Sequence, residues 1–122
     1  MELTKPGGAG SGLAGKKCVP CEGGEPPLRP DQIDQFRPQV PDWHVETVDG
    51  HPSLVKTFTF KDFVGSIDFV NKVRDVAEGE GHHPDLKIHW NKVRVENWTH
   101  ATGGLHENDF ILAAKIDQLV KS

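Results

Sequence analysis

The 122-residue sequence predicts an α+β domain in which two long helices pack on one face of a four-stranded antiparallel sheet. Two pairs of strand-like runs, each pair followed by a run with helical periodicity, carry this prediction. Because strands joined by short turns pair antiparallel, the expected element order is ββαββα. The sequence contains no Gly-rich loop of the GxGxxG or Walker type, so nucleotide binding is not indicated.

The first strand pair is predicted over residues 43–48 and 54–60. The earlier run alternates in polarity, the later run is rich in β-branched and aromatic residues, and residues 49–53 supply turn chemistry. A short helix with Asp31 as its N-cap, stopped by Pro38, can precede this pair.

The first long helix is expected to follow Asp62, its N-cap, and to end near Gly79 or Gly81. Apolar residues recur there with a period of about 3.6 residues, which predicts one buried side. That side is expected to contain Phe63, Ile67, Val70, Val73 or Arg74, and Ala77, widened by Val64 and Val76.

The second strand pair is predicted over residues 86–90 and 93–100, because apolar and polar residues alternate in both runs. Asn91-Lys92 is expected to form the turn between them. After Gly103-Gly104, a last helix is predicted from about Glu107 to Val120.

The composition, 35% hydrophobic and 26% charged, suits one domain with a single core. Residues 1–17, rich in Gly and Ala, are expected to be a flexible lead, and residues 18–122 a single domain. The formal charge of −4 argues against direct binding of nucleic acid. No run of 18 apolar residues occurs, so no membrane span is expected. A cytoplasmic location is favoured, or an organelle where the N-terminus is the remnant of a transit peptide.

Cys18 and Cys21 are the two cysteines, at CxxC spacing. A tetrahedral zinc site needs two further ligands and no second CxxC is present, while a redox motif needs a helix that begins inside it. A metal clip and a redox pair stay open, but a plain surface turn is the favoured interpretation.

Residues 78–109 hold most of the histidines of the chain. His82 and His83 precede Pro84 in a connection, where functional side chains concentrate, and they can point to two sides of one pocket. His100 ends the last strand, so the hairpin brings it to the same end of the sheet. Strand alternation places His100 on the face away from the core unless the end of the strand re-aims it. His89 and His106 are expected to be surface residues.

Asp109 shares the inward face of the last helix, where an unpaired carboxylate is costly. Two roles stay open: an acid that bonds the free N–H groups of the first helical turn, and a partner that orients an imidazole, with His100 as the expected one. Metal binding is disfavoured because no HExxH spacing occurs and adjacent histidines chelate one ion poorly. No GxSxG nucleophile is present either. General acid/base catalysis is therefore the favoured chemistry.

Several motifs together resemble those of the pterin-4a-carbinolamine dehydratases, over roughly residues 18–120. They are Glu78-x-x-x-His82-His83-Pro84, Trp90-Asn-Lys-Val93, Thr99-His100, Gly104-Leu105 and Asp109-x-x-Leu112-Ala113. The resemblance implies a lyase that removes water from 4a-hydroxytetrahydropterin to give quinonoid dihydropterin in tetrahydropterin recycling. It implies a homodimer or homotetramer with a small-molecule pterin substrate and no metal or other cofactor.

The resemblance also implies the roles of the site residues. His82, His83 and His100 are the catalytic candidates, with Asp109 in support. Glu78, Pro84, Trp90 and Thr99 are the candidates for binding the pterin, with Trp90 as an aromatic wall. Gly81, Leu86 and Asn108 depart from the residues common in animal members, which affects contacts to the pterin.

A second class of function is also compatible with the resemblance. Animal relatives act as dimerisation cofactors of a homeodomain transcription factor, and some plastid relatives are linked to Rubisco assembly. A protein that only binds partners has no need for three histidines and an acid at these spacings, so the enzyme is the favoured interpretation.

Overall fold

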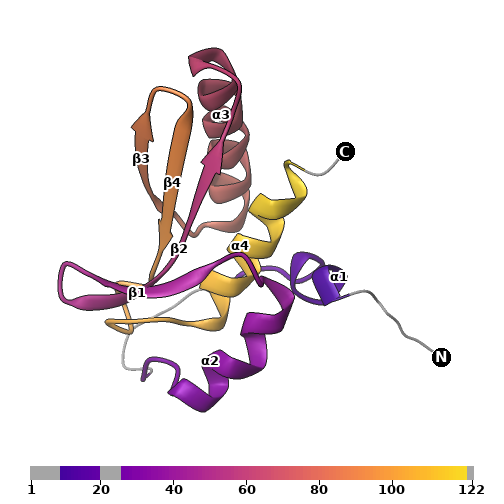
Figure 1. The fold of residues 1–122 in the computed structure, drawn as a ribbon. Coiled ribbons are helices and arrows are strands. Elements are labelled where there is room, and N and C mark those ends of the chain that lie inside the picture. The colour runs from indigo at the N-terminus through magenta and orange to yellow at the C-terminus, as the bar shows by residue number, and fades with distance from the viewer. Residues whose placement is uncertain (1–8, 20–25, 121–122) are drawn as a thin grey trace.

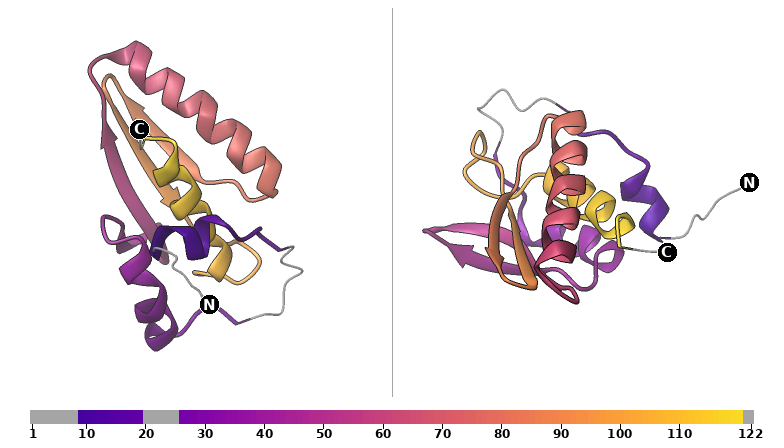
Figure 2. Two further views of the ribbon diagram at one scale, coloured as in Figure 1. Left: turned by 90° about the vertical axis from the view of Figure 1, so that its right-hand side faces the viewer. Right: turned by 90° about the horizontal axis from the view of Figure 1, so that it is seen from above.

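The computed structural model describes residues 9–19 and 26–120, which form one sheet covered by helices (Figure 1). The helices are α1 (Ala9–Ala14), α2 (Pro30–Phe36), which continues into a 3-10 turn (Arg37–Gln39), α3 (Phe63–Glu80) and α4 (Glu107–Gln118). The strands are β1 (His44–Val48), β2 (His51–Thr59), β3 (Asp85–His89) and β4 (Lys92–Asn97). All strand pairs are antiparallel in the order β1-β2-β4-β3, with α3 and α4 on the same face (Figure 2). The predicted α+β class is confirmed.

The first hairpin has a tighter turn than predicted. Asp49 and Gly50 both have positive φ, 51° and 85°, so two residues close the hairpin, as in a type I′ turn. His51 therefore pairs with Val48 as the first residue of β2. The strand begins before Leu54, and this extension brings a histidine into the sheet.

The turn of the second hairpin lies one residue earlier than predicted. His89 pairs with Lys92, so Trp90 and Asn91 form the turn and Trp90 adopts a φ of 50°. The Ser66 hydroxyl of α3 donates a hydrogen bond of 2.7 Å to the Trp90 carbonyl. Trp90 is consequently a turn residue with 62% of its surface exposed, and not the end of a strand.

The caps of α3 agree with the prediction, and its buried face agrees in part: Val73 and Ala77 are buried, and Val70 and Val76 pack against the core. The Asp62 side chain accepts from the Gly65 N–H at 2.8 Å, and Gly81, with φ of 66°, ends the helix in the left-handed conformation. The buried residues are Ser66, Phe69, Val73 and Ala77. Phe63 is half exposed, because the hydrogen bond from Ser66 and the packing of Phe69 against Phe58, with ring centroids 4.6 Å apart, rotate the helix.

The structure differs from the flexible lead expected over residues 1–17. Leu13 of α1 is 1% exposed within the core, and the ammonium of Lys115 on α4 donates to the Ala14 carbonyl at 2.8 Å. The Gly- and Ala-rich composition of this stretch gave no sign that Leu13 packs in the core. Residues 1–8 lie outside the described part of the chain.

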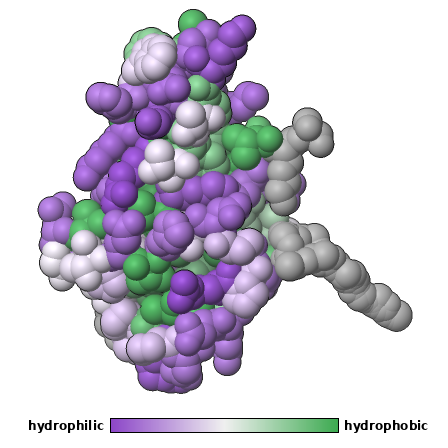
Figure 3. All heavy atoms as spheres, in the orientation of Figure 1, coloured by the Kyte–Doolittle hydropathy of each residue, from purple (hydrophilic) through white to green (hydrophobic). Residues whose placement is uncertain are grey.

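The surface seen in Figure 3 is largely hydrophilic, with scattered apolar side chains. The longest helix, α3, has 18 residues and carries charged residues along its length. Within residues 9–19 and 26–120, no helix is both long and apolar enough to cross a membrane.

Leu13→Ala tests whether α1 is part of the folded core. The substitution is expected to lower the free energy of unfolding by about 2–4 kcal/mol, because it removes buried methyl groups and leaves a cavity. Urea unfolding followed by circular dichroism measures this difference. Val64→Ala, at a position 66% exposed on α3, is the control and should change stability by less than about 0.5 kcal/mol. A Leu13→Ala protein as stable as wild type would show that α1 contributes nothing to the core.

Candidate active site

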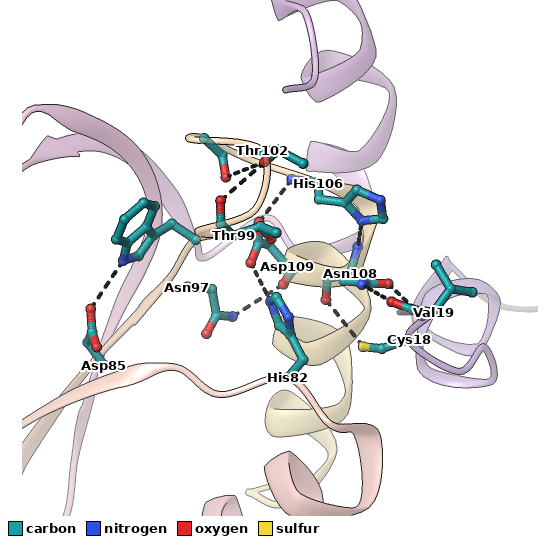
Figure 4. Close-up of polar contacts among 12 residues, drawn as sticks. Cys18, Val19, His82, Asp85, Asn97, Thr99, Thr102, His106, Asn108 and Asp109 are labelled. Atoms are coloured by element: carbon teal, nitrogen blue, oxygen red, sulfur yellow. Dashed lines mark hydrogen bonds and ion pairs between the residues drawn. The ribbon is translucent and has the colours of Figure 1, made fainter. Parts of the chain in front are cut away.

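Asp109, in the first turn of α4, is fully buried and lies at the centre of a hydrogen-bond network (Figure 4). The Thr99 hydroxyl and the His106 backbone N–H both donate to its Oδ2 at 2.9 Å. Nε2 of His82 lies 2.6 Å from its Oδ1. Three separate segments thus supply hydrogen-bond partners to one carboxylate, which removes the cost of burying it.

Asp109 fills both of the roles that the sequence left open, but its imidazole partner is His82 and not His100. The hydrogen bond from the His106 N–H makes Asp109 a first-turn capping acid of α4. The alternation of β4 explains the change of partner, since Asn97 and Thr99 both face Asp109. His100 consequently projects from the other side of the strand, and the backbone turns after it.

The loop from Thr99 to Gly104 is closed by a backbone pair. The Thr99 N–H donates to the Gly104 carbonyl at 2.9 Å, and Gly103 adopts a φ of 73° that favours glycine. A Cβ on Gly104 would lie 2.9 Å from Cβ of Pro27. Gly103 therefore suits the left-handed turn after His100, and Gly104 leaves room for the packing of Pro27 against this loop.

A pocket of about 330 Å³ opens at this end of the sheet. It is lined by Gly81, His82, His83, Pro84, Asp85, Trp98, Thr99 and His100. The structure thus brings together all three predicted catalytic histidines with two of the predicted binding residues. Asp109 lies behind the lining, in contact with His82 and Thr99.

His83 and Glu78 form a second histidine–carboxylate pair at the exposed rim. Nε2 of His83 lies 2.6 Å from Oε2 of Glu78, and the two side chains are 60% and 71% exposed. Glu78 does not line the pocket itself, but it holds a residue that does. The two adjacent histidines therefore differ in environment, because the His82 side chain is only 11% exposed.

The structure does not bring Trp90 to the pocket. Trp90 lies in the turn at the far end of the β3–β4 hairpin, whereas the pocket lies where β3 begins and β4 ends. The aromatic residue that lines this pocket is Trp98, whose indole Nε1 donates to Oδ2 of Asp85 at 3.3 Å. Strand alternation grouped Trp98 with His100 on one face, and that was the signal that could have identified it.

An ionic cluster lies on the face of the sheet that carries Trp98. The Glu96 carboxylate is 2.6 Å from Nε of Arg94 and 3.2 Å from Nζ of Lys87. Burial raises the pKa of Glu96, but the hydrogen bonds from Arg94 and Lys87 outweigh burial and hold this pKa below its ordinary value. Glu96 stays charged near neutral pH. In the β3–β4 ladder its position lies directly opposite that of Asp85.

Cys18 is half-buried beside α4 and the end of α3, where its N–H donates to Oε1 of Glu80 at 2.8 Å. Burial and the negative charge of Glu80 raise the pKa of the Cys18 thiol to about 12. The thiolate is the form that binds metals and attacks disulfides, so this environment disfavours both roles for Cys18. Cys21 lies outside the described residues, so the structure does not test a joint role of Cys18 and Cys21. Among the residues that the structure describes, no group of three His, Cys, Asp or Glu is placed to hold a metal ion.

Comparisons with known proteins agree on one family. A family model described as pterin 4 alpha carbinolamine dehydratase matches residues 26–119. A Chlorobium limicola protein named "Putative pterin-4-alpha-carbinolamine dehydratase" is 52% identical over 98 residues, which are 80% of this chain and 87% of that relative.

Two solved structures share the fold. A transcriptional coactivator/pterin dehydratase from Brucella melitensis aligns with a TM-score of 0.70 at 27% identity, covering 78% of this chain and 99% of that one. A pterin dehydratase-like protein, identified as a RuBisCO assembly factor in the alpha-carboxysome, aligns with a TM-score of 0.56 at 26% identity. That alignment covers 66% of this chain and 92% of the other.

The reactivity of Cys18 tests its environment. In a Cys21→Ser protein at pH 8, iodoacetamide is expected to alkylate Cys18 on the order of 10³-fold more slowly than an unperturbed thiol, because the thiolate fraction falls tenfold for each unit of pKa. Mass spectrometry over time measures the rate. Glu80→Gln should accelerate alkylation because it removes a negative charge that raises the pKa of Cys18. Equal rates for the folded and the urea-unfolded protein would contradict this account.

Proposed function

We propose that this chain, which belongs to the pterin 4 alpha carbinolamine dehydratase family, removes water from 4a-hydroxytetrahydropterin to give quinonoid dihydropterin. The observation that carries this proposal is a single pocket lined by two imidazoles held in different ways, His82 and His100. The pocket volume of about 330 Å³ suits a small bicyclic ligand. The reaction supports the recycling of a tetrahydropterin.

The reaction is an elimination of water that requires proton transfers and no redox partner. The bond between C4a and its hydroxyl oxygen breaks, an acid donates a proton so that this oxygen leaves as water, and a base takes the proton of N5. No electrons are exchanged with another molecule. Each positioned side chain that acts as a general acid or base can raise the rate by about 10²–10⁴-fold.

His82 suits one of these two roles because its tautomer is set. The carboxylate of Asp109 accepts hydrogen bonds from Thr99 and from the His106 N–H, so the His82 Nε2 facing it is the nitrogen that carries the proton. Nδ1 of His82 is then the atom that exchanges a proton with the substrate. The close pairing with Asp109 supports an oriented ring in the resting site.

His100 suits the second role. It is exposed on the loop after β4 and lines the same pocket, where its ring rests on the indole of Trp98. His82 and His100 thus share the acid and base roles in this proposal. His83, held by Glu78 at the rim, binds the pterin, while Pro84 and Thr99 shape the walls. Trp90 does not line this pocket.

A homodimer or homotetramer is part of the same proposal. The described sheet is open, with β1 and β3 at its edges, and unpaired strand edges favour association with a further chain. Size-exclusion chromatography with light scattering determines the assembly.

A protein that acts through binding alone is the alternative. The names of the Brucella melitensis coactivator/dehydratase and of the carboxysomal assembly factor motivate it, since both share this fold. The pocket favours catalysis, because binding a partner protein does not require three histidines and a buried carboxylate around one pocket. Capture of a specific partner by a protein without dehydratase activity on synthetic carbinolamine would reverse the ranking.

Stopped-flow dehydration of synthetic 4a-carbinolamine tests the assignment. His100→Ala is expected to lower kcat by about 10²-fold or more, because it removes an acid/base group. Asp109→Asn is expected to lower kcat by about tenfold or more, because the amide oxygen stays with the Thr99 and His106 donors and an NH2 donor then faces His82, which disfavours the tautomer protonated at Nε2. Metal content is measured in the same preparations, and circular dichroism verifies folding.

His89→Ala is the matched control, since His89 is an exposed histidine at the far end of β3. It should leave kcat unchanged. A near-normal rate of dehydration by the His100→Ala protein would contradict the acid/base role of His100.

A further inference from the structure

Three aromatic rings form a column at the mouth of the pocket. His51, the first residue of β2, stacks on Trp98 with ring centroids 3.3 Å apart and an angle of 18° between planes. The ring of His100 lies 3.9 Å from the Trp98 ring centroid, at an angle of 41°. His51 does not line the pocket, whereas Trp98 and His100 both do.

Both imidazoles lie over the indole of Trp98, His51 nearly parallel to it and His100 at a tilt. Ring centroids closer than about 4 Å are possible only for rings that lie over a face, since edge contacts place centroids farther apart. Trp98 therefore contacts an imidazole from β2 and another from the loop after β4.

The column is anchored to two strands beside β4. The Trp98 Nε1–H donates to Oδ2 of Asp85 at the start of β3. Nδ1 of His51 lies 3.2 Å from Oγ of Ser53, which is fully buried in β2. The first contact fixes the indole and the second fixes the imidazole stacked on it, so the ring presented to His100 has a defined position.

We infer that Trp98 and His51 are positioning residues that set the orientation of His100. The inference rests on the proposed acid/base role of His100. No hydrogen bond from another described residue reaches the imidazole of His100, so the indole is the surface that restrains it. Catalysis is sensitive to such restraint, because a displacement of about 1 Å can cost about 10²-fold in rate.

Kinetics distinguish positioning from substrate contact. Trp98→Leu and His51→Ala are each expected to lower kcat for dehydration by about tenfold, with KM changed by less than about twofold. Trp98→Phe and His51→Phe, which keep a ring to stack, should retain most of kcat. His89→Ala is the control for loss of an exposed histidine. If Trp98→Leu fails to fold, His51→Ala decides the outcome, because His51 lies outside the pocket.

The proton spectrum of the His100 ring provides a readout that does not depend on activity. The ring current of the indole should shift the His100 Cε1–H signal upfield, and Trp98→Leu should abolish this shift while Trp98→Phe keeps part of it. A rise in KM with unchanged kcat would overturn the inference and make Trp98 a substrate contact. Normal kcat in His51→Ala and Trp98→Leu, with an active wild type, would overturn it as well.

A wild-type protein without dehydratase activity would instead contradict the proposed function. The ring-current shift still tests the column in that case. Its absence from the wild-type spectrum would overturn the positioning of His100 independently of activity.

Discussion

The burial of the Asp109 carboxylate is the constraint on which the site depends. A carboxylate without exposure to water is stable only when donors surround it. Its partners come from the loop after α3, the end of β4 and the backbone just before α4. These segments can meet only where both long helices and β4 reach the same end of the sheet. The hydrogen bonds that stabilise the buried Asp109 carboxylate therefore also position His82.

The alternation of β4 divides the pocket between the two faces of the sheet. Asn97 and Thr99 point to the helices and bond Asp109, so Trp98 and His100 lie on the opposite side. His82 is consequently held by a carboxylate, whereas the ring of His100 lies against the Trp98 ring at an angle of 41°. A charge-assisted hydrogen bond sets a tautomer, whereas a ring contact sets an orientation and leaves both ring nitrogens available. In the proposed function, these different restraints suit the two histidines to two different proton transfers.

Much of this molecule could be predicted from local sequence signals, and the errors have local causes. Asp62 and Gly81 marked the ends of α3, since caps depend on the residue at one position. The shift of the second turn by one residue moved Trp90 out of its strand, and the length of the hairpin separates this turn from the pocket. Leu13 was missed because one apolar residue in a glycine-rich stretch has no periodicity to reveal it.

The sequence by itself determined the α+β class, the antiparallel hairpins and the histidines and acid of the candidate site, because periodicity, turn chemistry and spacing are properties of short segments. Only the tertiary structure decided that Asp109 pairs with His82, that Trp98 lines the pocket and that His51 stacks on it. Each of these contacts joins residues from different elements. Strand register, the rotation of α3 and the satisfaction of a buried charge select such partners together, and no single stretch of the chain contains that information.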